Sequence, residues 1–131
     1  MSGLKNRVEG MSGKRILLVD DEPVVGQCVQ IFLELDRHET EFVHNPLEAL
    51  AKYQPGKYDL VLTDNRMPEM TGVELAEKIK SLSREQRIML LTGFPPSRPT
   101  PAIDLVMLKP FSGDALRRAV AELTTYAESV R

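Results

Sequence analysis

The chain has 131 residues, of which 42% are hydrophobic and 27% are charged, and its formal net charge is −2. This length gives one domain enough residues for a hydrophobic core of its own. Direct binding to nucleic acid is disfavoured because phosphate backbones require a basic excess. No apolar run is long enough to span a membrane.

The first residues, MSGLKNRVEGMSGKR, lack the apolar stretch that signal peptides carry. Cys28 is the only cysteine, so no intramolecular disulfide can form, and this suits the cytoplasm. We therefore expect a cytoplasmic protein with a disordered lead-in at 1–13 and one domain at 14–128.

The first half of this domain alternates between strand and helix patterns. Arg15–Val19 is almost entirely apolar, which is typical of a strand buried on both faces. Pro23 suits the first turn of a helix that runs to about Asp36. The apolar residues that predict an amphipathic helix here are Val24, Val25, Cys28, Ile31, Phe32 and Leu35. A strand is expected over 39–43, followed by a helix that Asn45 caps and that ends near 54.

The second half continues this alternation with one interruption. Strands are expected over 58–63, 87–91 and 103–108, and helices over 72–81 and 111–127. Where a fourth helix would lie, the segment 93–102 contains Pro95, Pro96, Pro99 and Pro101, which prevent a regular helix. The whole pattern predicts an α/β fold, a parallel sheet with helices on both faces, in which a proline-rich loop shortens or replaces the fourth helix.

Polar residues follow four of the five expected strands. They are Asp20 and Asp21 after the first strand, Asp64 after the third, Thr92 after the fourth and Lys109 after the fifth. Taken singly, each has an ordinary structural role as a helix cap, a turn residue or a solvated lysine. Because parallel strands end at a common edge, where such sheets bind ligands, we expect these side chains to form one site.

The residue types at this edge restrict its chemistry. Two carboxylates about 4 Å apart repel by roughly 4 kcal/mol at an effective dielectric of ~20, so Asp20, Asp21 and Asp64 must share protons or hold a cation. Oxygen ligands without His or Cys suit Mg²⁺, and the spacing of His38 and His44 does not indicate a metal site. A carboxylate beside Mg²⁺ that faces an ammonium and a hydroxyl suits formation of an acyl phosphate.

Four motifs in this order resemble the receiver domain of two-component response regulators over about residues 14–128. The motifs are Ile-Leu-Leu-Val-Asp20-Asp21-Glu22, Asp64-Asn-Arg-Met-Pro68 with Gly72, Leu-Thr92-Gly93 and Lys109-Pro110-Phe111. The resemblance implies a flavodoxin-like sheet of five strands in the order 2-1-3-4-5. It also implies a cis bond between Lys109 and Pro110.

The resemblance further implies a role for each matching residue. Asp64 would accept a phosphoryl group, with Asp21 as a direct Mg²⁺ ligand and Asp20 acting mostly through bound water. The backbone carbonyl of Arg66 would be the third protein ligand. The hydroxyl of Thr92 would turn toward the phosphoryl group, and Lys109 would bind it.

The same resemblance implies partners and a class of activity. The phosphodonor would be a histidine kinase or a histidine phosphotransfer protein, a downstream protein would read the phosphorylated state, and a homodimer is left open. Such a protein modifies only itself, so we do not expect an enzyme.

Two departures from the receiver pattern bear on how such a domain would signal. Val106 stands where receivers usually carry a Tyr or Phe ring that moves with the threonine, and the segment 93–102 replaces a helix that many relatives use to bind partners. We therefore hypothesise that the chain signals through a different surface, or through ordering of 93–102 when Asp64 is phosphorylated. Arg66 and Phe94 occupy positions where side chains commonly tune the lifetime of the phosphoryl group in this family.

Two other classes of function are open. A phosphate-independent interaction module is favoured by Val106 and the missing helix, and disfavoured by the intact set of site residues. A Mg²⁺-dependent phosphatase resembling haloacid dehalogenases would typically place an acid two residues after the nucleophile, where this chain has Arg66.

Overall fold

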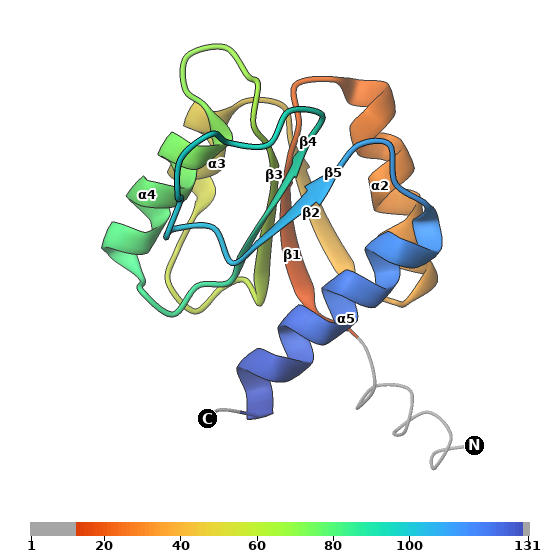
Figure 1. Ribbon diagram of the computed structural model, residues 1–131. Coiled ribbons are helices and arrows are strands. Elements are labelled where there is room, and N and C mark those ends of the chain that lie inside the picture. The colour runs from red at the N-terminus through yellow and green to blue at the C-terminus, as the bar shows by residue number, and fades with distance from the viewer. Residues whose placement is uncertain (1–12, 130–131) are drawn as a thin grey trace, which may run out of the picture.

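The computed structural model describes residues 13–129, so the predicted lead-in lies outside the described residues except for Gly13. The strands are β1 (Arg15–Val19), β2 (Glu39–Val43), β3 (Leu60–Asp64), β4 (Ile88–Thr92) and β5 (Leu105–Leu108). The helices are α2 (Pro23–Leu35), α3 (Pro46–Lys52), α4 (Gly72–Leu82) and α5 (Gly113–Ser129). Figure 1 shows the sheet between two layers, with α2 and α5 on one face and α3 and α4 on the other.

The sheet has five parallel strands in the order β2-β1-β3-β4-β5, which confirms the predicted fold. Its register aligns the ends of the strands, because Val19 pairs with Thr63, Asp64 with Leu91 and Thr92 with Leu108. The residues that follow β1, β4 and β5 therefore meet at one edge with Asp64.

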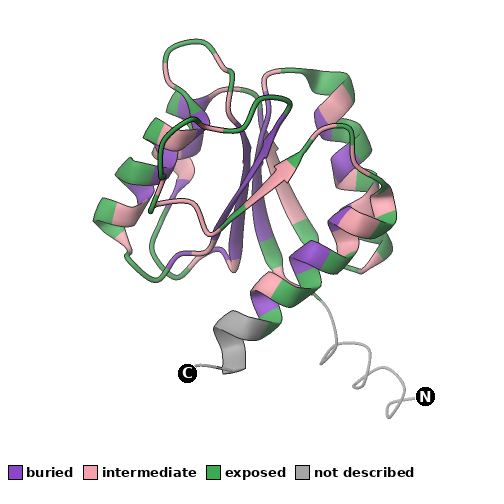
Figure 2. Ribbon diagram, in the orientation of Figure 1, coloured by how far each residue is buried: buried purple, intermediate pink, exposed green. Residues whose placement is uncertain are grey.

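Two hydrophobic clusters, one on each face, hold the sheet between its helices. β3 and β4 are buried along their whole length, and β1 is buried after its first residue, as the purple strands in Figure 2 show. This burial explains why these strands are apolar without alternation. β5 differs, because Leu105 and Leu108 are exposed and its central residues are half-buried. Among the described residues, no helix is long and apolar enough to cross a membrane.

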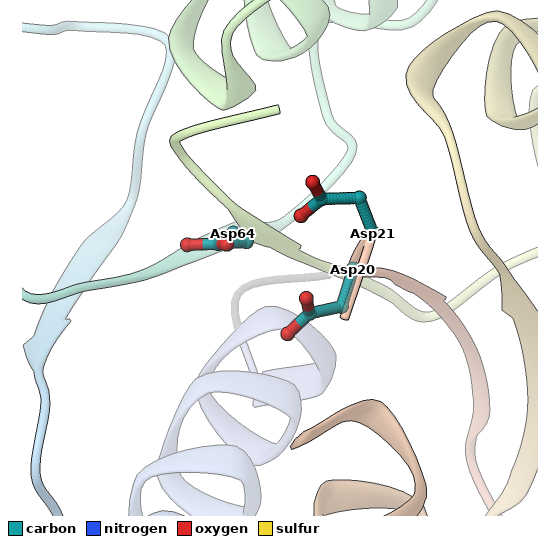
Figure 3. Close-up of side chains that lie close together, drawn as sticks. All are labelled: Asp20, Asp21 and Asp64. Carbon is teal, nitrogen blue, oxygen red and sulfur yellow. The ribbon is translucent and has the colours of Figure 1, made fainter. Parts of the chain in front are cut away.

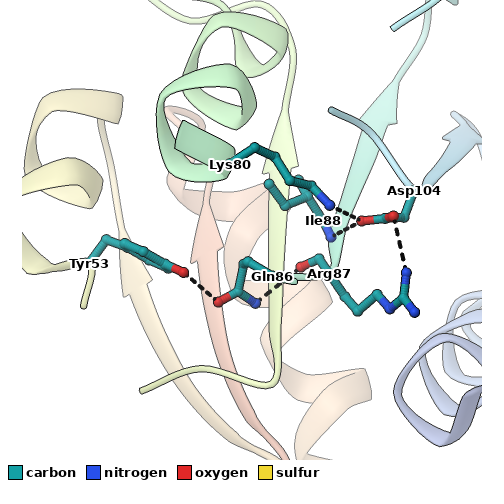
Figure 4. A network of polar contacts seen from close by, with 6 residues as sticks. All are labelled: Tyr53, Lys80, Gln86, Arg87, Ile88 and Asp104. Carbon is teal, nitrogen blue, oxygen red and sulfur yellow. Dashed lines mark hydrogen bonds and ion pairs between the residues drawn. The ribbon is translucent and has the colours of Figure 1, made fainter. Parts of the chain in front are cut away.

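The segment 93–102 forms a loop without helix, as the prolines predict. Its far end is fixed by Asp104, whose carboxylate accepts the N–H of Ile88 at 2.8 Å and pairs with Lys80 Nζ at 3.1 Å and Arg87 Nη1 at 3.3 Å (Figure 4). Asp104 thereby connects the start of β5 to β4 and α4.

The apolar residues that predict the amphipathic helix α2 do not all lie on its buried face. Gly26, Val29 and Leu33 are buried, whereas Val24 and Ile31 are 71% and 59% exposed. Cys28 and Leu35 are also exposed. The helix is apolar on several sides, so spacing alone could not select the face that packs. Contact with β2 selects it: Gly26 lies against the ring of Phe42, where a Cβ would be 2.0 Å from Cζ.

Most element boundaries agree with the prediction to within two residues. β5 begins at Leu105 rather than 103, because the N–H of Ile103 donates to Thr100 O at 2.9 Å in a turn before the strand. α5 begins at Gly113 rather than 111, because Ser112 Oγ accepts the N–H of Ala115 at 3.0 Å and so caps its start. The peptide bond between Lys109 and Pro110 is cis, as the resemblance implied.

Candidate phosphoryl-acceptor site

The turn after β3 holds Asp64 in place. Asp64 Oδ1 accepts the N–H of Asn65 at 2.8 Å. Asn65 then closes the turn, because its Oδ1 accepts the N–H of Val73 at 3.1 Å and its carbonyl accepts the N–H of Gly72 at 2.9 Å. Sequence reasoning did not identify Asn65, although an Asn after a strand is a known signal for such side-chain-closed turns.

Gly72 allows α4 to start directly against β3. A Cβ at this position would lie 2.2 Å from the carbonyl oxygen of Asp64 and 2.9 Å from Leu90 Cδ1. Any other residue would therefore push α4 away from the strand that carries Asp64. Thr71 and Glu74 cap the helix reciprocally, at 3.1 and 2.9 Å, which fixes its first turn.

Asp20, Asp21 and Asp64 lie together, as predicted. Figure 3 shows the first two after β1 and the third at the end of β3, and carboxylate oxygens of all three lie within 4.8 Å of one another. Asp20 is 1% exposed, and its Oδ1 accepts the N–H of Glu22 at 2.9 Å. Burial, aided by the charge of Asp64, raises the pKa of Asp20 to about 6, against the opposing effects of the Glu22 N–H and Lys109.

A divalent cation of the Mg²⁺ type fits this donor set. The cluster offers hard oxygen ligands with no His or Cys. A cation would offset the repulsion between Asp20 and Asp64, which adds to the effect of burial on the pKa of Asp20. The histidines make other contacts: His38 Nδ1 accepts the N–H of Lys14 at 3.2 Å, and the exposed ring of His44 lies with its centroid 4.6 Å from that of Phe42. Neither is a member of the three-carboxylate group.

Lys109 and Thr92 bring a cation and a hydroxyl to the same edge. Lys109 Nζ lies 3.5 Å from Asp64 Oδ1, and the N–H of Lys109 donates to Thr92 O at 2.9 Å. Thr92 is 1% exposed. Its hydroxyl donates to Phe94 O and accepts the N–H of Phe94, both at 3.1 Å.

These side chains border a pocket of about 240 Å³ that is open to solvent. Its lining residues are Asp21, Glu22, Asp64, Arg66, Thr92, Gly93, Phe94 and Lys109. The guanidinium of Arg66 lies over the ring of Phe94, 4.1 Å from its centroid. The pocket thus offers a carboxylate for nucleophilic attack, with an ammonium and a hydroxyl to receive the oxygens of a tetrahedral anion.

Comparison with known proteins places this arrangement in a family. A family model described as the response regulator receiver domain matches residues 16–121. The response regulator receiver protein CpdR of Brucella abortus is 33% identical over 103 residues, which cover 75% of this chain and 86% of CpdR. A gliding motility regulatory protein of Myxococcus xanthus is 36% identical over 77 residues, but the match spans only 10% of its length. The chain thus corresponds to a small part of some relatives.

Solved structures agree with the sequence matches. A CheY-like receiver domain protein from Methanospirillum hungatei has a TM-score of 0.84 at 28% identity, with 92% of this chain and 100% of that one covered. The response regulator TrrA of Thermotoga maritima, solved with Mg²⁺ and BeF, has a TM-score of 0.79 at 36% identity, over 84% of this chain and 98% of TrrA. TrrA has also been solved in complex with the histidine kinase ThkA, where the TM-score is 0.76 over 84% of this chain and 97% of TrrA.

The shared fold, the family model over most of the chain and the match to nearly all of CpdR agree. The chain belongs to the family of response regulator receiver domains of two-component systems.

Proposed function

We propose that Asp64 accepts a phosphoryl group from a histidine kinase or a histidine phosphotransfer protein, in a reaction that depends on Mg²⁺, and that this changes the binding of another protein. The observation that carries the proposal is the position of the Asp64 carboxylate, within 4.8 Å of Asp20 and Asp21 and 3.5 Å from Lys109 Nζ. The relative TrrA has been solved with Mg²⁺ and BeF and with its histidine kinase, which supports both the cofactor and the donor.

In the proposed reaction a carboxylate oxygen of Asp64 forms a bond to phosphorus. The bond between phosphorus and the donor's imidazole nitrogen breaks, and the imidazole leaves with the electron pair of that bond. The carboxylate of Asp64 attacks directly in the proposed step, so no general base takes part. Lys109 and Thr92 would bind oxygens of the transferred group.

Mg²⁺ would be held by Asp20, Asp21 and Asp64, with the carbonyl of Arg66 proposed as a further ligand. When bound, it would supply positive charge that offsets the charge of the phosphoryl oxygens. The fixed turn at Asn65 and Gly72 keeps Asp64 in the orientation that both the cation and the donor require.

The product stays on the chain itself, so we propose that this protein is a stoichiometric phosphoacceptor and not an enzyme that turns over substrate. A phosphatase with an aspartyl nucleophile is disfavoured, because the side chain two residues after Asp64 is the guanidinium of Arg66, which stacks on Phe94. A cytoplasmic location is part of the proposal and is supported by the single, unpaired Cys28.

The exposed stripe of α2 is the proposed docking surface for the donor. Val24, Cys28, Ile31 and Leu35 follow one another at spacings of four, three and four residues, which matches the seam along which two helices pack. α2 starts at Pro23, two residues after Asp21, so this surface begins next to the carboxylates of the site in the sequence. Ile31→Glu should abolish transfer from a kinase that phosphorylates the parent chain and leave modification by acetyl phosphate unchanged. Leu47→Glu, at an exposed position on α3, is the control.

The phosphate-independent interaction module is the alternative, and one feature favours it. β5 carries Val106 in place of an aromatic ring and is partly exposed where a covering helix is absent. This alternative needs no chemistry at Asp64.

Incubation with acetyl phosphate and intact mass measurement tests the proposal against the alternative. We expect the chain to gain one phosphoryl group in Mg²⁺ and none in EDTA. Asp64→Asn should abolish the gain, whereas Asp114→Asn, at an exposed carboxylate on α5, should retain it. A folded, Mg²⁺-loaded protein that gains nothing would reject the proposal in favour of the interaction module.

A further inference from the structure

Thr63 is a polar residue in the interior of the sheet. It lies in β3 directly before Asp64, and it is 0% exposed. A buried hydroxyl costs free energy unless it is hydrogen-bonded, and a valine of nearly the same shape would avoid that cost. The hydroxyl of Thr63 does have a partner, because it donates to the backbone carbonyl of Asp64 at 2.8 Å.

This hydrogen bond holds Asp64 at the point where the sheet stops supporting it on one side. The pairing of β3 with β1 ends at Thr63 and Val19, whereas the pairing with β4 continues to Asp64 and Leu91. The carbonyl oxygen of Asp64 is contacted instead by the Thr63 hydroxyl and by the start of α4, where a Cβ at Gly72 would lie 2.2 Å from it. The direction of this carbonyl is therefore fixed by side-chain and helix contacts.

The direction of the carbonyl sets the direction of the next N–H. The carbonyl of Asp64 and the N–H of Asn65 belong to one planar peptide unit, so a contact that fixes one of them fixes the other. This N–H donates to Asp64 Oδ1 at 2.8 Å. The hydroxyl of Thr63 thus acts on the carboxylate of Asp64 through two hydrogen bonds and one rigid peptide group.

We propose that Thr63 is a positioning residue for phosphoryl transfer, and that its hydroxyl orients the carboxylate of Asp64 through the peptide group between Asp64 and Asn65. This inference rests on the proposed function. Thr63 does not line the pocket of the site, so it acts on the reaction only through Asp64. Asp64 Oδ1 also lies 3.5 Å from Lys109 Nζ, so a rotated carboxylate would change both the attacking oxygen and this ion pair.

Phosphorylation by acetyl phosphate at saturating Mg²⁺ is followed by intact mass over a range of donor concentrations. The maximal rate and the half-saturating donor concentration are compared for the parent chain, Thr63→Val, which lacks the hydroxyl, and Thr63→Ser, which retains it. Thr124→Val is the matched control, because Thr124 is also buried and donates its hydroxyl to a backbone carbonyl, that of Val120 in α5, at 2.9 Å. Thermal unfolding measures the stability of each variant.

We expect Thr63→Val to lower the maximal rate by roughly 2- to 13-fold, the factor that one net hydrogen bond represents, and to leave the half-saturating donor concentration unchanged. Thr63→Ser should recover most of the rate, and Thr124→Val should react as the parent does. In NMR spectra, the amide proton of Asn65 should move upfield in Thr63→Val, because its bond to Asp64 Oδ1 is weakened, and should stay in place in Thr63→Ser.

Two results would overturn the inference while the proposed function stands. One is a maximal rate in Thr63→Val equal to that of the parent. The other is an equal loss of rate in Thr124→Val, which would assign the effect to stability. If Thr63→Val does not fold, Thr63→Ala also lacks the hydroxyl and allows the same comparison. A parent chain that gains no phosphoryl group would instead reject the proposed function, and this inference with it.

Discussion

β3 and β4 are both buried strands that end in a residue of the site, but the segments that follow them are held in different ways. After β3, Asn65 closes the turn, and Gly72 has no room for a Cβ. After β4, a Cβ at Gly93 would meet nothing within 4 Å, and the loop is held at its near end through the hydroxyl of Thr92. Asp64, the proposed nucleophile, therefore lies on the more rigid side of the site, whereas the Thr92 hydroxyl lies beside a loop that can rearrange at lower cost.

The largest expected effect contrasts β3, which is buried, with β5, the partly exposed strand that follows the loop 93–102. Leu62→Ala, in the centre of β3, should lower the free energy of unfolding by about 2–5 kcal/mol, because it leaves a cavity in the core. Leu108→Ala, at the half-exposed end of β5, should cost less than about 1 kcal/mol. Urea denaturation of both variants measures this. Equal losses of unfolding free energy in the two variants would mean that β5 is as well covered in solution as β3.

Asp20 should make the stability of the folded protein depend on pH. Its pKa is raised to about 6 in the folded protein, from 3.8 in a model peptide, so the folded state binds the proton more tightly than the unfolded state. Protonation of Asp20 therefore stabilises the folded state by up to about 3 kcal/mol. This stabilisation is fully present below about pH 4 and is lost as the pH rises to about 6.

Asparagine does not ionise, so Asp20→Asn should not lose stability over this pH range. In EDTA the variant should therefore be more stable than the parent at pH 7, and the difference in stability should be smaller at pH 4. The same change should weaken Mg²⁺ binding. Thermal unfolding at both pH values measures the first effect, with Asp114→Asn as a control for an exposed carboxylate. A parent chain that is more stable than Asp20→Asn in EDTA at pH 7 would contradict this interpretation of the cluster.

The two glycines provide a smaller but closely matched comparison. Gly72→Ala should destabilise the protein by roughly 1–3 kcal/mol and displace α4, because the new Cβ overlaps the carbonyl of Asp64. Gly93→Ala should change stability by no more than about 0.5 kcal/mol, since the space is open. Thermal unfolding of the pair is the measurement, and a larger loss at Gly93 would show that the loop is more restricted than we infer.

The smallest effect concerns the stack of Arg66 on Phe94. Arg66→Ala should lower stability by about 0.5–1 kcal/mol, which is typical of exposed cation–π pairs. Arg66→Lys should retain part of this. Denaturation of both variants with and without Phe94→Leu gives the coupling energy between the two side chains, and a coupling of zero would show that the stack does not stabilise the loop.

Much of this molecule could be predicted from sequence because β1, β3, β4 and β5 are largely apolar and polar residues lie at or after their ends. The strand order came from the family resemblance, and the positions of Asp20, Asp64 and Lys109 at one edge follow once the strands are parallel. The buried face of α2 could not be predicted, because apolar residues lie on more than one side of the helix and packing against the sheet, as where Gly26 meets Phe42, selects the side that is buried. The bonds between Thr92 and Phe94 depend on the backbone of an irregular loop, for which no periodic signal exists.

Two amides report the difference between the two sides most directly. The N–H groups of Val73 and Phe94 each donate to a side-chain oxygen at 3.1 Å, Val73 to Asn65 on the rigid side and Phe94 to Thr92 on the other. Residue-resolved hydrogen exchange would compare them in the unphosphorylated and the fully phosphorylated wild-type chain. A phosphoryl group on Asp64 would offer anionic acceptors in the pocket that Thr92 also lines, and these would compete for its hydroxyl. We therefore predict that phosphorylation speeds exchange at Phe94 by roughly 2- to 13-fold, the factor that one net hydrogen bond represents, and leaves exchange at Val73 unchanged. Equal changes at both amides, or faster exchange at Val73 alone, would contradict the account.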